Sequence, residues 1–171
     1  MGNCALQTTM AITTLRGYTR ACGRQSGGVS RIGIIEAANL KSVTVEDGVI
    51  TAIEFEDGAK FKDYQSVLDQ AEYKFANGEA SLLIRLNRAG KASSIAHNEL
   101  AEVIPCGVFA LAQLNNGETA LIGYTEEFGK ERPIISFDSD SGSGKAPSDD
   151  NYFDITLKTT QIMAPLFLSE T

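Results

Sequence analysis

Four turn dipeptides, each set between short apolar runs, constrain the fold of this 171-residue chain more than any other feature of its sequence. They are Asp47-Gly48, Asp57-Gly58, Asn77-Gly78 and Asn116-Gly117. Asn-Gly and Asp-Gly favour two-residue β-hairpin turns, because a type I′ turn needs positive φ at both central residues. Their spacing predicts a chain built mostly of short antiparallel strands.

The runs around these turns alternate apolar and polar residues, which is typical of strands with one buried face. The first two turns predict a β-meander over residues 42–64. The third predicts a hairpin that joins Tyr73 and Phe75 to the run 81–87. The fourth predicts a hairpin that joins the apolar runs 108–114 and 119–124.

The C-terminal part predicts a short strand at Ile134, Ile135 and Phe137 and a last strand over residues 152–158. In the last strand, alternation predicts that Phe153, Ile155 and Leu157 point inward. Between these strands, residues 138–151 are rich in Ser, Gly and Asp. We expect them to form a mobile loop, since such a composition packs no core.

One segment has the period of a helix instead, over about residues 91–104. Pro105 and Gly107 are expected to end it. Its apolar residues recur at helical spacing and predict a single buried stripe. They are Ala92, Ile95, Ala96, Leu100, Val103 and Ile104.

Together these segments predict a mainly β (α+β) fold, a β-sandwich or barrel of short antiparallel strands with one flanking helix. Residues 1–30 are small and polar, contain several glycines and show no sustained period, so we expect an extended N-terminal arm. Residues 31–171 are then a single β-rich domain, a size at which a chain buries a core without disulfides or metals.

The net charge of −7 and the pI near 4.7 argue against a general binder of nucleic-acid phosphates, which needs clustered Lys and Arg. The charge is uneven. The first 31 residues carry four arginines and no Asp or Glu, whereas residues 138–154 are acidic with Lys145 as the only cation. Opposite ends of this kind suit head-to-tail contact between identical subunits, although two solvated tails are an equally good interpretation.

The three cysteines, Cys4, Cys22 and Cys106, have unrelated spacings and form neither a disulfide framework nor a metal-binding pair of the CxxC type. We expect reduced thiols. The chain begins with no signal-peptide pattern, and no window approaches the roughly 18 apolar residues of a membrane span. These features predict a protein that stays soluble in a reducing compartment, without contact with a membrane.

Candidate chemistry is sparse. His97, the only histidine, has no acidic or cysteine partner at helical spacing, so we expect an exposed or rim histidine without a role. The segment Ser141–Lys145 matches a phosphate-binding loop only in part. Asp138, Asp140 and Asp149 have a spacing that partly matches a Ca²⁺ loop, and we rank an unligated loop well ahead of Ca²⁺ binding. We therefore expect no enzyme, no metal and no cofactor.

Several segments resemble a pattern found in tail-tube and connector-ring virion proteins of bacteriophages that infect Bacteroidetes. The hairpin, helix, hairpin order across residues 71–124 carries part of the resemblance. Three shorter pieces carry the rest: the glycine-rich entry over residues 22–32, the turn segment 116–123 and the closing segment 150–157.

This resemblance implies a homo-oligomeric ring or tube around a channel for DNA, assembled in the host cytoplasm and located in the virion. Its partners would be copies of itself and other tail or connector proteins, with DNA only as lumen content. A stacked tube usually needs a long hairpin that reaches the next ring. We expect short hairpins here, so a single connector ring stays an alternative to a tube. The candidate interface residues are Arg16, Arg20, Arg24, Arg31, Ile32, Ile34, Asp138 and Asp140.

Two alternatives remain. A capsid-decorating or fibre-attachment protein would share the composition but would close as a trimer. A small cysteine-dependent hydrolase would pair Cys106 or Cys22 with His97, because catalytic partners need to meet only in space.

Overall fold

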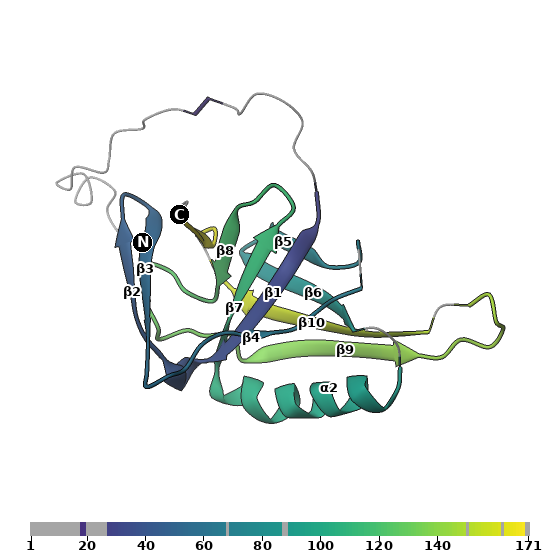
Figure 1. Cartoon of the computed structure of the whole chain (residues 1–171). Coiled ribbons are helices and arrows are strands. Elements are labelled where there is room, and N and C mark those ends of the chain that lie inside the picture. Colours follow the sequence, from purple (N-terminus) through teal and green to yellow (C-terminus); the bar gives the residue numbers. More distant parts are fainter. Residues whose placement is uncertain are drawn as a thin grey trace.

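The computed structural model describes residues 18–19, 27–67, 69–86, 89–149, 151–161 and 163–169. It confirms the predicted fold class, a mainly β structure that has two sheets and one α-helix in these residues (Figure 1). The arm predicted for residues 1–30 falls mostly outside the described residues. Within the described part of the chain, no helix is long and apolar enough to cross a membrane.

The larger sheet, sheet A, has seven strands, and each adjacent pair is antiparallel except β11 and β3, which are parallel. Its order is β2 (Leu40–Glu46), β3 (Val49–Phe55), β11 (Leu166–Leu168), β8 (Thr119–Ile122), β7 (Val108–Leu114), β1 (Val29–Glu36) and β4 (Lys62–Asp63).

The smaller sheet, sheet B, is antiparallel throughout. Its order is β5 (Glu72–Ala76), β6 (Glu79–Leu86), β10 (Tyr152–Thr160) and β9 (Ser136–Gly142). The helix α2 (Lys91–Val103) runs alongside β9 in Figure 1. The described part of the chain also contains two short 3-10 turns, η2 (Ala37–Asn39) and η3 (Ile104–Cys106).

The predicted hairpins form at three of the four turn dipeptides. Asp47-Gly48 joins β2 to β3, and Asn77-Gly78 joins β5 to β6. In both turns the two residues have positive φ, the geometry that a type I′ turn needs. The third hairpin joins β7 to β8 around Gly117, which has φ of +94°.

The meander predicted over residues 42–64 is wrong in its third strand. After the turn at Asp57-Gly58 the chain leaves β3 and forms β4 at the far margin of sheet A, where Lys62 pairs with Ile34 of β1. A turn dipeptide reports only a local reversal, whereas the pairing partner depends on long-range packing. The apolar segment before the C-terminus also forms a strand that the sequence did not predict, β11.

The mobile loop predicted over residues 138–151 is wrong in its first part. Residues 138–142 belong to β9, which pairs with β10 over seven positions from Tyr152 opposite Gly142 to Lys158 opposite Ser136. The expectation of short hairpins is also wrong, because β9 has seven residues and β10 has nine. The hairpin of β9 and β10 extends beyond the body of the molecule (Figure 1).

The last strand was predicted correctly, since Ile155 and Leu157 are fully buried and Phe153 packs against the core. The helix lies where it was predicted, but its buried face is rotated. Ile95 is 52% exposed, whereas Ser93 is buried. Burial on a helix is decided by the surfaces that it contacts, and these surfaces come from distant parts of the chain.

Two hydrophobic clusters lie on opposite faces of sheet A. The first fills the space between the two sheets and α2, and it includes Ile34, Ile155 and Leu100. The second includes Ile35 and Phe109, whose side chains leave the opposite face because neighbouring residues of a strand alternate. Its buried members, Ile35, Leu40, Ile50, Phe109 and Leu121, all belong to strands of sheet A.

Candidate functional site

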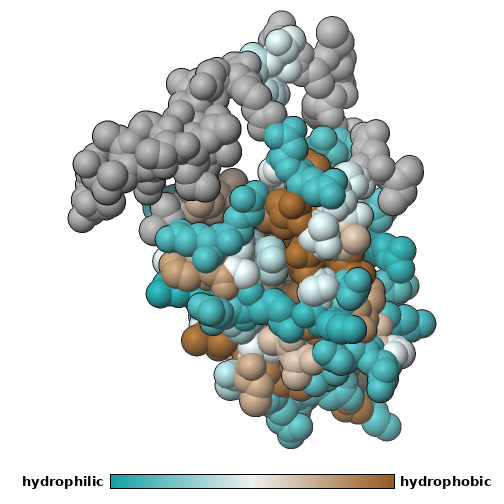
Figure 2. All heavy atoms as spheres, turned by 90° about the vertical axis from the view of Figure 1, so that its left-hand side faces the viewer, coloured by the Kyte–Doolittle hydropathy of each residue, from teal (hydrophilic) through white to brown (hydrophobic). Residues whose placement is uncertain are grey.

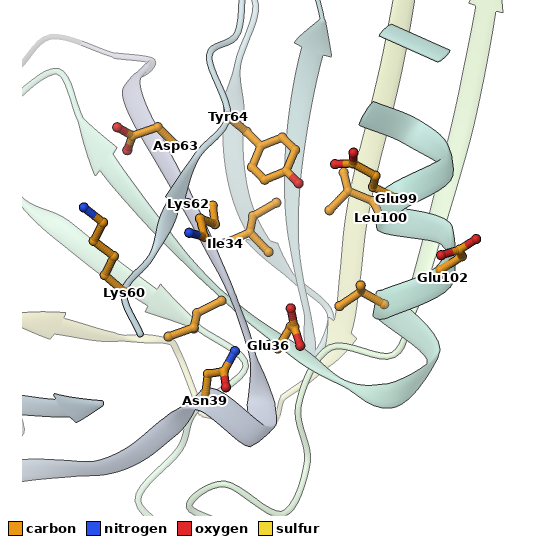
Figure 3. A pocket seen from close by; sticks show the side chains of 12 residues that line it. Ile34, Glu36, Asn39, Lys60, Lys62, Asp63, Tyr64, Glu99, Leu100 and Glu102 are labelled. Atoms are coloured by element: carbon orange, nitrogen blue, oxygen red, sulfur yellow. The ribbon is translucent and has the colours of Figure 1, made fainter. Parts of the chain in front are cut away.

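A groove of about 560 Å³ lies between α2 and the margin of sheet A formed by β1 and β4 (Figure 3). The helix supplies one wall, and the segment of residues 60–64 supplies the other. The lining residues are Ile34, Ile35, Glu36, Asn39, Lys60, Lys62, Asp63, Tyr64, Glu99, Leu100, Glu102 and Val103.

The two walls carry charges of opposite sign. Lys60 and Lys62 stand on the strand wall, and Glu99 and Glu102 stand on the helix wall (Figure 3). Asp63 turns away from the groove and binds Arg31 of β1, with Arg31 Nε 3.1 Å from Asp63 Oδ1. Within the described residues, no ion pair joins the two walls. The groove therefore has lysines on one wall and glutamates on the other.

The Tyr64 hydroxyl lies in this groove among carboxylates. In Figure 3 the ring points from the strand wall toward α2, where Glu99 lies opposite. Burial raises the pKa of Tyr64 above its usual value near 10, and the negative charges of Glu99 and Glu36 raise it further. The folded protein therefore favours the protonated phenol, so its contribution to stability is present below about pH 10 and is lost as the pH rises through the folded pKa.

We expect Glu99→Gln to lower the pKa of Tyr64 without returning it to the usual value, because burial remains the largest cause of the shift. The measurement is the ultraviolet phenolate absorbance during an alkaline titration, with the Tyr64→Phe spectrum subtracted to isolate this residue. Glu102→Gln is the matched control, since Glu102 lines the same groove but does not contribute to the shift. An equal change in both variants would contradict this geometry.

His97 and Cys106 do not form a catalytic pair. His97, predicted to be exposed or at the rim, is half-buried, with its ring 5.7 Å from the ring of Phe137 and 5.3 Å from that of Phe153, measured between centroids. Cys106 is exposed at the end of η3, nine residues farther along the same helical segment, a separation of about 13 Å at the rise of an α-helix. Cys22 lies outside the described residues.

The three aspartates with a partial Ca²⁺-loop spacing do not converge. Asp138 forms an ion pair with Lys158 across the hairpin, and Asp140 accepts a hydrogen bond from the hydroxyl of Tyr152. The carboxylate of Asp149 accepts hydrogen bonds from two backbone N–H groups of its own turn, which lowers its pKa. No cluster of three metal-binding side chains occurs among the residues that the structure describes.

The predicted interface residues occupy different environments. Arg31 is exposed and bound to Asp63, and both Asp138 and Asp140 are exposed on β9. Ile32 and Ile34 are 2% and 4% exposed, and both lie in the core between the sheets, so they offer very little surface to a partner. Arg16, Arg20 and Arg24 lie outside the described residues. The subunit contacts themselves stay a prediction.

The sequence did not predict the open margin of β9, the edge of sheet B. β9 is the last strand of sheet B, so its outer backbone groups pair with no strand in the described part of the chain. Five of its seven residues are exposed, among them Asp138 through Ser141. Its Ser, Asp and Gly residues give no apolar alternation, the signal by which strands are found.

Comparison with protein-family models, curated protein sequences and solved structures finds no match to this chain.

Proposed function

We propose that this chain is a virion structural protein that assembles with copies of itself into a ring or tube of a bacteriophage tail or head–tail connector. The open margin of β9 carries the proposal. A row of unpaired backbone N–H and C=O groups is a template for another strand, and an assembling protein uses such a margin where a monomer would cover it. The assignment to a phage tail rests on the resemblance carried by the sequence segments of residues 22–32, 71–124 and 150–157.

The length of the β9–β10 hairpin favours a stacked tube over a single connector ring. The hairpin runs from Ser136 to Thr160 and projects from the body of the molecule (Figure 1). A projecting hairpin of this kind reaches a subunit of the next ring. Seven register pairs between β9 and β10 hold the two strands together, and an exposed ion pair between Lys158 and Asp138 spans them.

Charge is consistent with this function. A net charge of −7 keeps the assembled surface from binding DNA, so a DNA molecule passes a channel of this composition without adhering. The hairpin is acidic, whereas the first 31 residues carry four arginines and no Asp or Glu, so the two regions supply opposite charges for contacts between neighbouring copies. Screening by salt weakens such exposed contacts.

The full-length protein is expected to form closed oligomers, visible as rings by electron microscopy and as a high mass by light scattering after size exclusion. Ser139→Lys places a charged side chain on the open margin of β9 and should weaken each contact by about tenfold or more, because an edge lysine opposes strand pairing. Ser94→Lys is the matched control, an exposed serine of α2 that lies outside the β9–β10 hairpin.

Light scattering that shows only a monomer at every concentration of the unmodified protein would overturn the proposed function. Trimers alone would instead favour a capsid-decorating or fibre-attachment protein. Equal dissociation of the two lysine variants would remove β9 as the contact strand.

A further inference from the structure

The outer face of sheet A, opposite to sheet B, carries an apolar surface that no second layer covers in the described part of the chain. The cluster on this face is made only by sheet A and its connections, and many of its members are half-buried. Figure 2 views the molecule from the side of the β2–β3 hairpin and shows hydrophobic side chains at the surface between hydrophilic ones. The half-buried members include Val43, Val45, Phe55, Phe61, Leu111, Leu166 and Leu168.

Within this face is a hollow of about 270 Å³, which we call the outer-face hollow. Gly33 and Leu111 are register partners on β1 and β7 and form its floor, since Gly33 has no side chain to fill the space. A Cβ atom at Gly33 would lie 2.9 Å from the Cβ of Phe61, so this position admits no larger residue without moving Phe61. The remaining lining residues are Arg31, Phe61, Asp63, Gln113, Thr119 and Leu168.

The hollow has the chemistry of a site for an extended peptide segment. Phe61, Leu111 and Leu168 offer apolar contact for its side chains. Gln113 and Thr119 stand beside them and offer hydrogen-bonding groups for its backbone. Its small volume fits a few side chains of one segment and not the face of another sheet.

The first 15 residues of the chain match this chemistry. They contain no Asp, Glu, Lys or Arg, and they carry Leu6, Met10, Ile12 and Leu15 among several threonines. β-Branched and apolar residues of this kind favour extended backbone and pack on a sheet surface. The arginines begin only at position 16, so the uncharged stretch is separate from the basic one.

The attachment of this segment also lies close to the hollow. The amide nitrogen Nδ2 of Asn115 donates to the carbonyl of Gly27 at 2.6 Å, and the backbone N–H of Asn115 donates to the carbonyl of Gly28 at 3.0 Å. These bonds hold the chain immediately before β1, within six residues of Arg31 and Gly33. Tyr18 is 89% exposed, so at this position the chain makes little contact with its own body and is open to a neighbour.

We infer that the outer-face hollow binds the uncharged N-terminal segment, residues 1–15, of a neighbouring copy of the same chain. The inference rests on the proposed self-assembly, because it needs a second copy, and it adds the surface on which the arm docks. About ten extended residues between Tyr18 and Gly28 span at most roughly 35 Å, a reach that is long enough to cross to an adjoining subunit.

The test is cross-linking between two distinguishable full-length chains. The donor chain keeps Cys4 and carries Cys22→Ser and Cys106→Ser. The acceptor chain carries Cys4→Ser, Cys22→Ser, Cys106→Ser and Thr119→Cys, which places its only thiol at the hollow. A control acceptor carries Ser148→Cys in place of Thr119→Cys. After mixing and treatment with a short bismaleimide, we expect about tenfold or more donor–acceptor product at Thr119→Cys, because docking raises the effective concentration.

A second variant pair tests the apolar contact. Leu168→Asp places a charge in the hollow and should abolish this cross-link. Val49→Asp is the matched control, since Val49 is also an exposed apolar residue of sheet A but lies outside the hollow. Retention of the cross-link in Leu168→Asp would overturn the inference.

Light scattering on the same samples separates the two proposals. High-mass assemblies without donor–acceptor product would overturn the docking of the arm and leave self-assembly standing. Product only within a single chain that carries both Cys4 and Thr119→Cys would overturn exchange between copies. A monomer at every concentration would overturn the proposed function and this inference with it.

Discussion

Asp154→Ala should lower the free energy of unfolding by about 2–3 kcal/mol, because it leaves the guanidinium of Arg85 half-buried without its carboxylate. The two side chains face each other across β6 and β10, with Arg85 Nε 2.7 Å from Asp154 Oδ1 and Nη2 2.9 Å from Oδ2. Their exposed fractions are only 25% and 17%. The value lies between those of an exposed ion pair and a fully buried one.

Asp138→Ala is the matched control. Asp138 also pairs with a cation across the strands of this sheet, Lys158, but it is 68% exposed, so solvent replaces the lost contact. Thermal unfolding followed by circular dichroism is the measurement. A loss of about 2–3 kcal/mol corresponds to a fall of roughly 5–10 °C in Tm for a domain of this size. Equal falls in both variants would show that burial does not strengthen the Arg85–Asp154 pair.

The local parts of this fold could be predicted from the sequence, because they depend on a few adjacent residues. Asp47-Gly48 and Asn77-Gly78 adopt the positive φ angles that their side chains favour, and each fixes the register of its hairpin. Pro105 and Gly107 likewise end the helical segment close to the predicted position. In each case the physical cause lies within the turn itself.

The long-range parts could not be predicted. β11 contains only three residues, and its place between β3 and β8 depends on side chains from three separate segments. β4 has two residues and reaches β1 through packing of Phe61 over Gly33. A short strand with few contacts of its own carries no periodic signal, so its partner appears only once the sheet has formed.

The groove and the outer-face hollow could not be predicted either, because each joins segments that are far apart in the sequence. The groove joins β1, the segment of residues 60–64 and α2, while the outer-face hollow joins β1, β7 and β11. No single stretch of sequence contains either set. The β9 margin was missed for a different reason, since its polar residues resemble a loop, and only backbone pairing with β10 makes them a strand.

The assembly proposals depend on a firm junction between α2 and β7, because α2 lies beside β9 of sheet B and β7 is an inner strand of sheet A. Gly107 forms that junction. Its N–H donates to the carbonyl of Ile104 at 2.8 Å, and its carbonyl accepts from the N–H of Ala37 at 3.0 Å. It has φ of +104°, a backbone region that glycine alone adopts without strain.

Gly107→Ala should therefore destabilise the protein by about 3–5 kcal/mol, through backbone strain and a steric clash together. The new Cβ would lie 2.6 Å from Cγ of Pro133, a ring that has little freedom to move. Gly48→Ala is the matched control, since Gly48 also has positive φ, +82°, but no atom lies within 4 Å of its added Cβ. Its loss should be limited to about 1–2 kcal/mol of strain. Denaturant unfolding measures both, and a loss in Gly107→Ala no larger than that in Gly48→Ala would show that Pro133 moves aside and that the junction is not rigid.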